Sequence, residues 1–209
     1  MKQIVCFGDS NTYGLEPGTG ERYPWGTRWT SILNEKLGLH MFRVVEEGLC
    51  GRTTIFEDPL RSGRRGTQML PAVLETHGPS EIIILMLGTN DCKQVYGATA
   101  DLIARGAGKA IEQIKAYAKG SKILLISPIH LGEEVWREEF DPEFSRDSVE
   151  VSKKLAESLE KVARKEDVFF LDASLYAQPS SEDQEHMNAE GHRHLAQAVY
   201  EKVEAILSA

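Results

Sequence analysis

Short apolar runs of strand length alternate along this sequence with longer segments in which apolar residues recur at helical spacing. The runs EIIILMLG at residues 81–88 and KILLIS at residues 122–127 are almost continuously apolar, which is typical of parallel strands covered on both faces. The pattern predicts strands over residues 3–7, 42–46, 81–87, 122–127 and 168–172. It predicts helices over residues 28–37, 67–76, 99–119, 146–165 and 188–208.

This succession of strand and helix units restricts the chain to an α/β fold, because right-handed crossovers carry the helices to the two faces of one parallel sheet. We expect three layers, α/β/α, around a five-stranded parallel sheet with the flavodoxin-like strand order 2-1-3-4-5. The chain has 209 residues and contains no internal repeat, low-complexity tract or linker. We therefore predict a single domain over residues 1–209.

Polar, glycine-rich loops follow the first, second, third and fifth predicted strands. They are GDSN at residues 8–11, EEGLCGRTT at 46–54, LGTND at 87–91 and DQEHMNAEGH at 183–192. In open parallel sheets the ligand binds beyond the carboxyl ends of the strands, near the switch in strand order. Because all of these loops leave that edge, we expect them to converge on one site.

In these loops the chain resembles the SGNH hydrolases, also called GDSL-type esterases. That family is marked by a serine in a G-D-S loop, a glycine after the second strand, a G-x-N-D sequence after the third and a D-x-x-H sequence near the C-terminus. The matching residues here are, in that order, Ser10, Gly51, Asn90, and Asp183 with His186. The stretches FGDSNTYG, EEGLCGRTT and MLGTND are similar to the arylesterase and acyltransferase branch. Asn11 departs from the pattern. The family has a leucine at this position, the residue that gives it its name.

These residue types fit acyl transfer, which needs a nucleophile, a base and donors for the oxygen that becomes negative. Ser10 offers a hydroxyl, His186 can accept its proton, and Asp183 can hold the other ring nitrogen. The resemblance implies an oxyanion hole made of the backbone amides of Ser10 and Gly51 and the side-chain amide of Asn90. No metal and no organic cofactor is expected. With a histidine base, activity is expected to fall as the pH drops through roughly 6–7.

Other residues compete with this set. Asp172, at the end of the fifth predicted strand, is the alternative acid, since an aspartate there can orient a histidine in other hydrolase folds. The competing histidines read as loop or helix residues and are His40, His77, His192 and His194. Asp9 and Asp91 are expected to brace their loops, and Cys50 and Cys92 to be small packing residues.

Residues 131–147, LGEEVWREEFDPEFSRD, are acidic and aromatic and have no clear periodicity. A loop of this length in a compact domain is often functional, so we interpret it as a lid or as a contact between subunits. Trp136 in this segment, His130 after the fourth strand and Asn11 beside Ser10 are candidate residues of the substrate pocket.

Charge and cysteine content limit the partners and the compartment. A net charge of −8 argues against nucleic acid or an anionic membrane surface as a partner. No apolar stretch approaches the length of about 18 residues that a membrane span needs. The first predicted strand begins too early to leave room for a signal peptide. Three cysteines at scattered spacing suit reduced thiols. We expect a cytoplasmic protein whose partner is a small-molecule ester, and we favour a homo-oligomer.

The resemblance implies a serine esterase that acts on small esters with short acyl chains, acetyl above all, through an acyl-enzyme on Ser10. The alcohol part is expected to be aryl or simple alkyl, and the same branch includes enzymes that transfer the acyl group to an alcohol. A carbohydrate O-acetyl esterase is an alternative with the same triad. A third hypothesis is a non-catalytic, flavodoxin-like module whose Ser10 loop binds phosphate or a nucleotide, although GxxxxGK[ST] and GxGxxG are both absent from the sequence.

Overall fold

The computed structural model describes residues 1–208 and contains one five-stranded parallel sheet. Its strands are β1 (Lys2–Gly8), β2 (Phe42–Gly48), β3 (Ile82–Met86), β4 (Lys122–Ser127) and β5 (Phe169–Asp172). The long helices are α2 (Trp29–Leu37), α3 (Gly66–Thr76), α4 (Ala100–Tyr117), α5 (Arg146–Glu166) and α6 (Ala189–Ser208). The strand order is β2-β1-β3-β4-β5, so the predicted α/β fold class and topology are confirmed.

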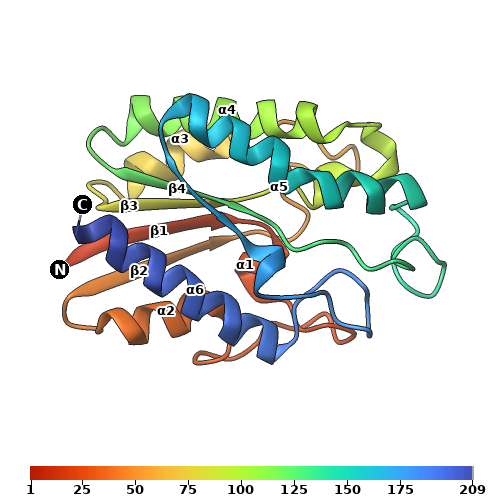
Figure 1. Ribbon diagram of the computed structural model, residues 1–209, viewed down its shortest axis with the longest axis horizontal. Helices are drawn as coiled ribbons and strands as arrows, with labels where there is room; N and C mark the ends of the chain where they lie inside the picture. The colour runs from red at the N-terminus through yellow and green to blue at the C-terminus, as the bar shows by residue number, and fades with distance from the viewer. Residues whose placement is uncertain (209) are drawn as a thin grey trace.

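Helices cover both faces of the sheet. Figure 1 shows α3, α4 and α5 on one side and α2 and α6 on the other. Alternate side chains of β1 enter different cores: Val5 and Phe7 pack with the first group of helices, and Ile4 and Cys6 with the second. This double burial explains why the strands read as continuous apolar runs in the sequence.

The last helix is held on the sheet by one apolar stripe. Leu195, Val199, Val203 and Ile206 of α6 are completely buried, as their spacing of three and four residues predicts. Because α6 directly follows the loop of residues 183–188, this packing also fixes where that loop ends.

Four short elements are absent from the sequence-based prediction. They are α1 (Ser10–Tyr13) and the 3-10 turns η1 (Asn90–Cys92), η2 (Gln94–Tyr96) and η3 (Ala173–Leu175). Residues 131–145 form turns without a helix or strand, as expected, and α5 begins at Arg146. Val135 and Phe144 of this segment are buried in the core, so much of it is anchored to the body of the protein.

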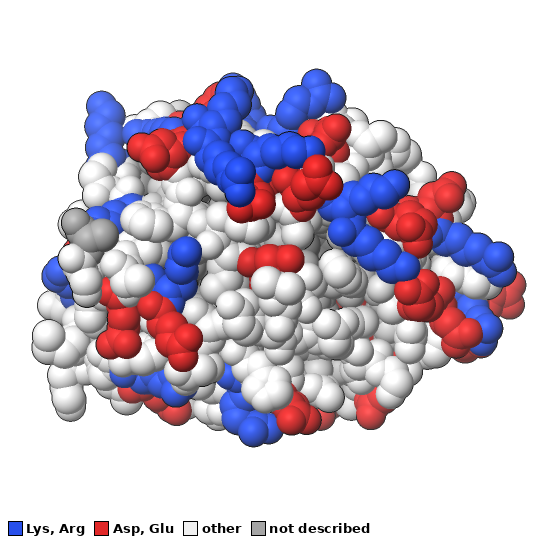
Figure 2. Space-filling view, viewed as in Figure 1, with Lys and Arg blue, Asp and Glu red and all other residues white. Residues whose placement is uncertain are grey.

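Charged residues are unevenly distributed on the face that carries α5, β5 and α6. Figure 2 shows Lys, Arg, Asp and Glu side chains around the margins of this face and a broad, largely uncharged area in the middle. Cys6, Cys50 and Cys92 are all unpaired. Among residues 1–208, no helix is both long enough and apolar enough to span a bilayer.

Candidate active site

The loops that follow β1, β2 and β3 meet the loop that precedes α6 at the carboxyl edge of the sheet, around α1 in Figure 1. A cavity of about 170 Å³ lies where they meet. Its lining residues are Ser10, Leu15, Cys50, Gly51, Arg61, Asn90, Lys93, Asp141, Glu143, Glu185 and His186. Residues that are up to 176 positions apart in the chain therefore face one small space.

Ser10 stands at the first position of α1, directly after the buried strand β1. The Asp9 carboxylate accepts a hydrogen bond from the amide of Asn11 at 3.0 Å and so caps this helix. Gly8 allows the tight turn, because a Cβ there would lie 2.0 Å from Oγ1 of Thr12. Burial raises the pKa of Asp9 to about 6. Asp9 thus braces the loop, as expected, and the hydroxyl of Ser10 is left to face the cavity.

Ser10, His186 and Asp183 form a continuous line of hydrogen bonds. Oγ of Ser10 lies 2.8 Å from Nε2 of His186, and Nδ1 of His186 lies 2.8 Å from Oδ2 of Asp183. Since a carboxylate only accepts, Nδ1 carries a proton, so Nε2 can accept from the serine whenever the ring is neutral. The other oxygen of Asp183 accepts from the amides of Glu185 and His186 at 3.0 and 2.9 Å.

The electrostatics of this line favour a charged imidazole. Burial raises the pKa of Asp183, but the hydrogen bonds and the charge of His186 outweigh burial and lower it. Burial lowers the pKa of His186, but the carboxylates of Glu185, Asp183 and Asp9 outweigh burial and raise it to about 9. The ring is therefore protonated at a higher pH than the ordinary histidine value of roughly 6.5 on which the sequence-based expectation rests.

Three donors surround the space in front of Ser10. Gly51 has a φ of +82°, a conformation that glycine adopts without strain, and the side-chain amide of Asn90 donates to the carbonyl of Arg52 at 3.2 Å. Among the described residues, the backbone amides of Ser10 and Gly51 donate to no backbone acceptor. This set of amides can stabilise an oxyanion.

Asp91 ties the loop after β3 to the loop after β2. Its carboxylate accepts from the backbone amide of Thr54 at 2.9 Å and from the Thr54 hydroxyl. Burial raises the pKa of Asp91 to about 7. The expected bracing role is therefore a link between two loops, which keeps Gly51 and Asn90 on the same side of the cavity.

Asn11, His130 and Trp136 are not among the lining residues of this cavity within the described chain, so their place in the substrate pocket stays a prediction. Asn11 is buried and turned toward the protein: its Oδ1 accepts from the amide of Met187, and its Nδ2 donates to the carbonyl of Glu185. The indole of Trp136 donates to the carbonyl of Glu133 and lines a separate cavity. The directions of the Asn11 and Trp136 side chains follow from loop geometry, which the sequence pattern does not reveal.

Asp172 and the competing histidines are not part of the line. Asp172 accepts from the amide and hydroxyl of Ser174. His77 is half-buried and lies 2.8 Å from Glu47, so it is more than a solvated loop residue. His192 is buried, and its Nδ1 accepts from the amide of Trp29. Burial raises the pKa of the thiols of Cys50 and Cys92, which disfavours the reactive thiolate, although Cys50 does line the cavity.

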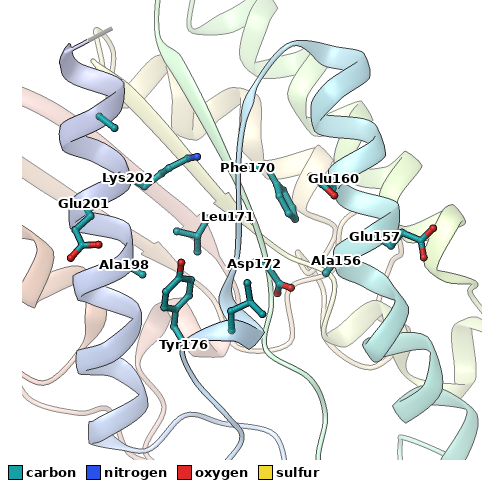
Figure 3. A pocket seen from close by; sticks show the side chains of 12 residues that line it. Ala156, Glu157, Glu160, Phe170, Leu171, Asp172, Tyr176, Ala198, Glu201 and Lys202 are labelled. Atoms are coloured by element: carbon teal, nitrogen blue, oxygen red, sulfur yellow. The ribbon is translucent and has the colours of Figure 1, made fainter.

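A larger cavity of about 700 Å³ lies elsewhere, over the edge strand β5. Figure 3 shows that its lining side chains come from α5, from β5 and the turn that follows it, and from α6. Phe170, Leu171 and Tyr176 are among its lining residues. As the described residues form it, its lining includes neither a serine nor a histidine, so its size alone does not make it a catalytic site.

The charged wall of the small cavity was missed by sequence reasoning. It consists of Arg61, Lys93, Asp141, Glu143 and Glu185. Glu185 stands between Asp183 and His186 in the sequence, and that position was the only available signal. Within residues 1–208, no group of three or more His, Cys, Asp or Glu side chains has the arrangement to hold a metal ion.

Comparison with known proteins gives one family and several close structures. The profile of the GDSL-like Lipase/Acylhydrolase family matches residues 6–194. An aryl esterase from M. smegmatis is 33% identical, covers 98% of this chain and 99% of its own, and superposes with a TM-score of 0.89. No curated relative matches the chain.

Two further structures are similar over almost the whole chain. Est24, a carbohydrate acetylesterase from Sinorhizobium meliloti, is 32% identical over 99% of this chain and 100% of its own, with a TM-score of 0.90. A putative arylesterase from Agrobacterium tumefaciens str. C58 has the same identity, coverage and TM-score.

Proposed function

The chain belongs to the GDSL-like lipase/acylhydrolase family and is a carboxylic ester hydrolase, and we propose that it cleaves short-acyl esters through an acyl-enzyme on Ser10. The observation that carries the proposal is the line of two 2.8 Å hydrogen bonds from Ser10 through His186 to Asp183. A serine hydroxyl is a weak nucleophile unless a base accepts its proton as it attacks.

In the proposed mechanism Oγ of Ser10 attacks the ester carbonyl while its proton passes to Nε2 of His186. Asp183 holds the ring in the required tautomer. The amides of Ser10, Gly51 and Asn90 face the negative oxygen of the tetrahedral intermediate. The C–O bond to the alcohol then breaks, the alcohol takes the proton from Nε2, and water repeats the sequence on the acyl-enzyme to release the acid.

The size and chemistry of the cavity support small, polar substrates. A space of about 170 Å³ suits an acetyl group with part of its alcohol and is below the range of roughly 300–1,000 Å³ of larger ligand pockets. The charged wall described above favours a second candidate, an O-acetylated carbohydrate, whose hydroxyl groups can hydrogen-bond to Arg61 and Lys93. The carbohydrate acetylesterase from Sinorhizobium meliloti supports this candidate as well.

Replacement of Ser10 tests the mechanism. We expect Ser10→Ala to lower kcat on phenyl acetate by about 10⁴-fold or more, because the triad acts as a unit, and to leave the circular dichroism spectrum and melting temperature close to wild type. A fluorophosphonate should label the wild type and not the variant. Full activity in a folded Ser10→Ala protein contradicts the proposal.

The substrate class is tested with the same wild-type enzyme. Comparison of kcat/KM for p-nitrophenyl esters of increasing acyl length, with and without added alcohol, measures the acyl cutoff and any acyl transfer. Comparison of phenyl acetate with an O-acetylated xylose separates the aryl-ester candidate from the carbohydrate candidate.

The proposal also covers the compartment and the oligomeric state of the enzyme. We propose that it acts in the cytoplasm, which the three unpaired cysteines support, and that it forms a homo-oligomer. The exposed side chains of Leu175 and Tyr176 beside the larger cavity support a contact between subunits. Light scattering after size-exclusion chromatography measures the number of subunits.

A further inference from the structure

Glu185 places a second carboxylate beside the imidazole of His186. Its Oε1 lies 3.8 Å from Nε2, the same nitrogen that lies 2.8 Å from Oγ of Ser10. Asp183 contacts the opposite nitrogen, Nδ1. The side chain of Glu185 is only 9% exposed and lines the cavity in front of Ser10. Both nitrogens of the ring therefore have a carboxylate nearby.

The backbone around Glu185 is tied to the loop that carries Ser10. The amide of Glu185 donates to Asp183 at 3.0 Å, and its carbonyl accepts from Nδ2 of Asn11 at 3.4 Å. The amide of the next residue but one, Met187, donates to Oδ1 of Asn11 at 3.0 Å. These bonds occupy the backbone of Glu185 and leave its carboxylate to face the ring, which keeps the carboxylate and the reacting serine on the same side of His186.

We propose that Glu185 is a positioning residue that acts through His186. Its carboxylate stabilises the positive charge that the imidazole acquires during acyl transfer. This inference rests on the proposed function. When Oγ of Ser10 bonds to the ester carbon, its proton moves to Nε2, and when the C–O bond breaks, that proton moves to the alcohol oxygen. Glu185 gains and loses no proton in either step.

The charges around the pair agree with this role. Charged and titratable groups surround the pair from several elements. They are Asp183 in the same loop, Asp9 at the cap of α1, Cys50 and Arg61 between β2 and α3, Lys93 after η1, Asp141 and Glu143 in the segment of residues 131–145, and His192 in α6. Burial lowers the pKa of His186, yet Glu185 and the other carboxylates raise it to about 9. Burial raises the pKa of Glu185, while the charges of His186 and Lys93 oppose that rise. Because the two groups interact, they titrate as a pair.

The proposed role of Glu185 predicts how kcat/KM depends on pH. Only the neutral ring accepts the proton of Ser10, so kcat/KM should rise with pH until the ring of His186 is deprotonated, near pH 9. Without the carboxylate of Glu185, the ring should lose its proton at a lower pH, closer to the ordinary value of roughly 6.5. The same change should lower the plateau at high pH, because the imidazolium in the transition state loses a nearby negative charge.

The experiment measures kcat/KM on phenyl acetate from pH 5 to 10.5 for the wild type, Glu185→Gln and Glu185→Asp. The acid limb is the part of the profile in which kcat/KM rises with pH. In Glu185→Gln this limb should move toward neutral pH by about one pH unit or more. The ratio of kcat/KM at pH 7 to its plateau value should therefore rise by about tenfold or more. Glu185→Asp should keep a limb closer to wild type. Glu182→Gln removes the same charge from an exposed residue directly before the loop of residues 183–187 and should leave the limb in place.

An unmoved limb in folded Glu185→Gln overturns the inference, and so does an equal movement in Glu182→Gln. A changed preference between phenyl acetate and an acetylated sugar at an unmoved limb also overturns it and assigns Glu185 to substrate binding. If Glu185→Gln does not fold, Glu185→Ser replaces it in the same measurement, and the same movement of the limb supports the role while an unmoved limb contradicts it. Failure of the fluorophosphonate to label wild-type Ser10 contradicts the proposed function itself, whereas normal labelling with an unmoved limb contradicts only the role of Glu185.

Discussion

Asn90 supplies the only side-chain amide among the proposed oxyanion donors. It is buried, lines the cavity and donates one hydrogen bond to the carbonyl of Arg52 at 3.2 Å. A side-chain amide has two N–H groups, so the second can donate to the substrate while the first fixes the orientation. We therefore expect the amide to reach the oxyanion without rearrangement.

We expect Asn90→Ala to lower kcat on phenyl acetate by about 10²–10³-fold with little change in KM, because the donor acts mainly in the transition state. Asn34→Ala is the matched control. Asn34 is a buried amide that bonds to the backbone of β2 at Phe42 and Val44, so its loss should reduce the melting temperature and leave kcat close to wild type. Equal effects on kcat in the two variants would show that Asn90 has only a structural role.

Residue types were easier to predict from the sequence than side-chain directions. Ser10, Asp183 and His186 stand out because acyl transfer requires those types, and the structure places them within hydrogen-bonding distance. Glu185 carries no such signature, since a glutamate in a polar loop is ordinarily a solvated residue. Asn11 shows the same limit, because nothing in the sequence reveals that its amide turns inward to bond Glu185 and Met187.

Among the secondary-structure elements, the junction of β2 and α1 permits the least change. Gly48, the last residue of β2, lies against the backbone of α1, and a Cβ there would lie 2.1 Å from the nitrogen of Tyr13. The atoms that such a Cβ would meet belong to backbone, which moves only if the whole of α1 moves. Since Ser10 begins α1, the position of the nucleophile depends on this contact.

We expect Gly48→Ala to displace α1 and to reduce kcat/KM by about 10²-fold, the loss that a displacement of roughly 1 Å can cause. Gly108→Ala in α4 is the control, because its Cβ would meet Val162 at an ordinary contact distance of 3.4 Å. That variant should keep full activity and gain stability through the higher helix propensity of alanine. Wild-type activity in Gly48→Ala would contradict the importance of the contact.

The strands and long helices were predicted to within two residues at every boundary. They could be predicted because each buries a face and is long enough to show its period. The elements that carry the site, α1 and η1, have four and three residues, which is too short for any period to appear. Sequence therefore located the loops of the site and gave no information on their internal geometry.

At the scale of the whole molecule, the buried His192 links protonation to stability. Its Nδ1 accepts from the amide of Trp29 at the start of α2, and its ring packs edge-on against Tyr23. Burial lowers the pKa of His192 to about 3. In the unfolded chain a histidine takes up its proton near roughly pH 6.5. Between these values the unfolded state binds one more proton than the folded state, so the free energy of unfolding falls as the pH falls.

We expect His192→Asn to flatten the dependence of unfolding free energy on pH between about 6.5 and 3 by up to about 1.4 kcal/mol per pH unit. Asparagine keeps an acceptor for the amide of Trp29, so the variant should still fold. Urea unfolding at several pH values measures the slope, and His40→Asn, at an exposed histidine, should retain the slope of the wild type. A slope that is the same in wild type and His192→Asn contradicts the prediction.

Because Ser10 follows the first strand and His186 lies just before the last helix, the proposed triad implies that the esterase is inactive while its chain is still being made. A nascent chain that has emerged as far as β5 holds the serine and four long helices, yet lacks its base. We therefore expect catalysis to begin only after translation has passed the loop of residues 183–187 and α6 has docked on the sheet. Hydrolysis of a chromogenic ester can therefore serve as a clock for the final step of folding on and off the ribosome.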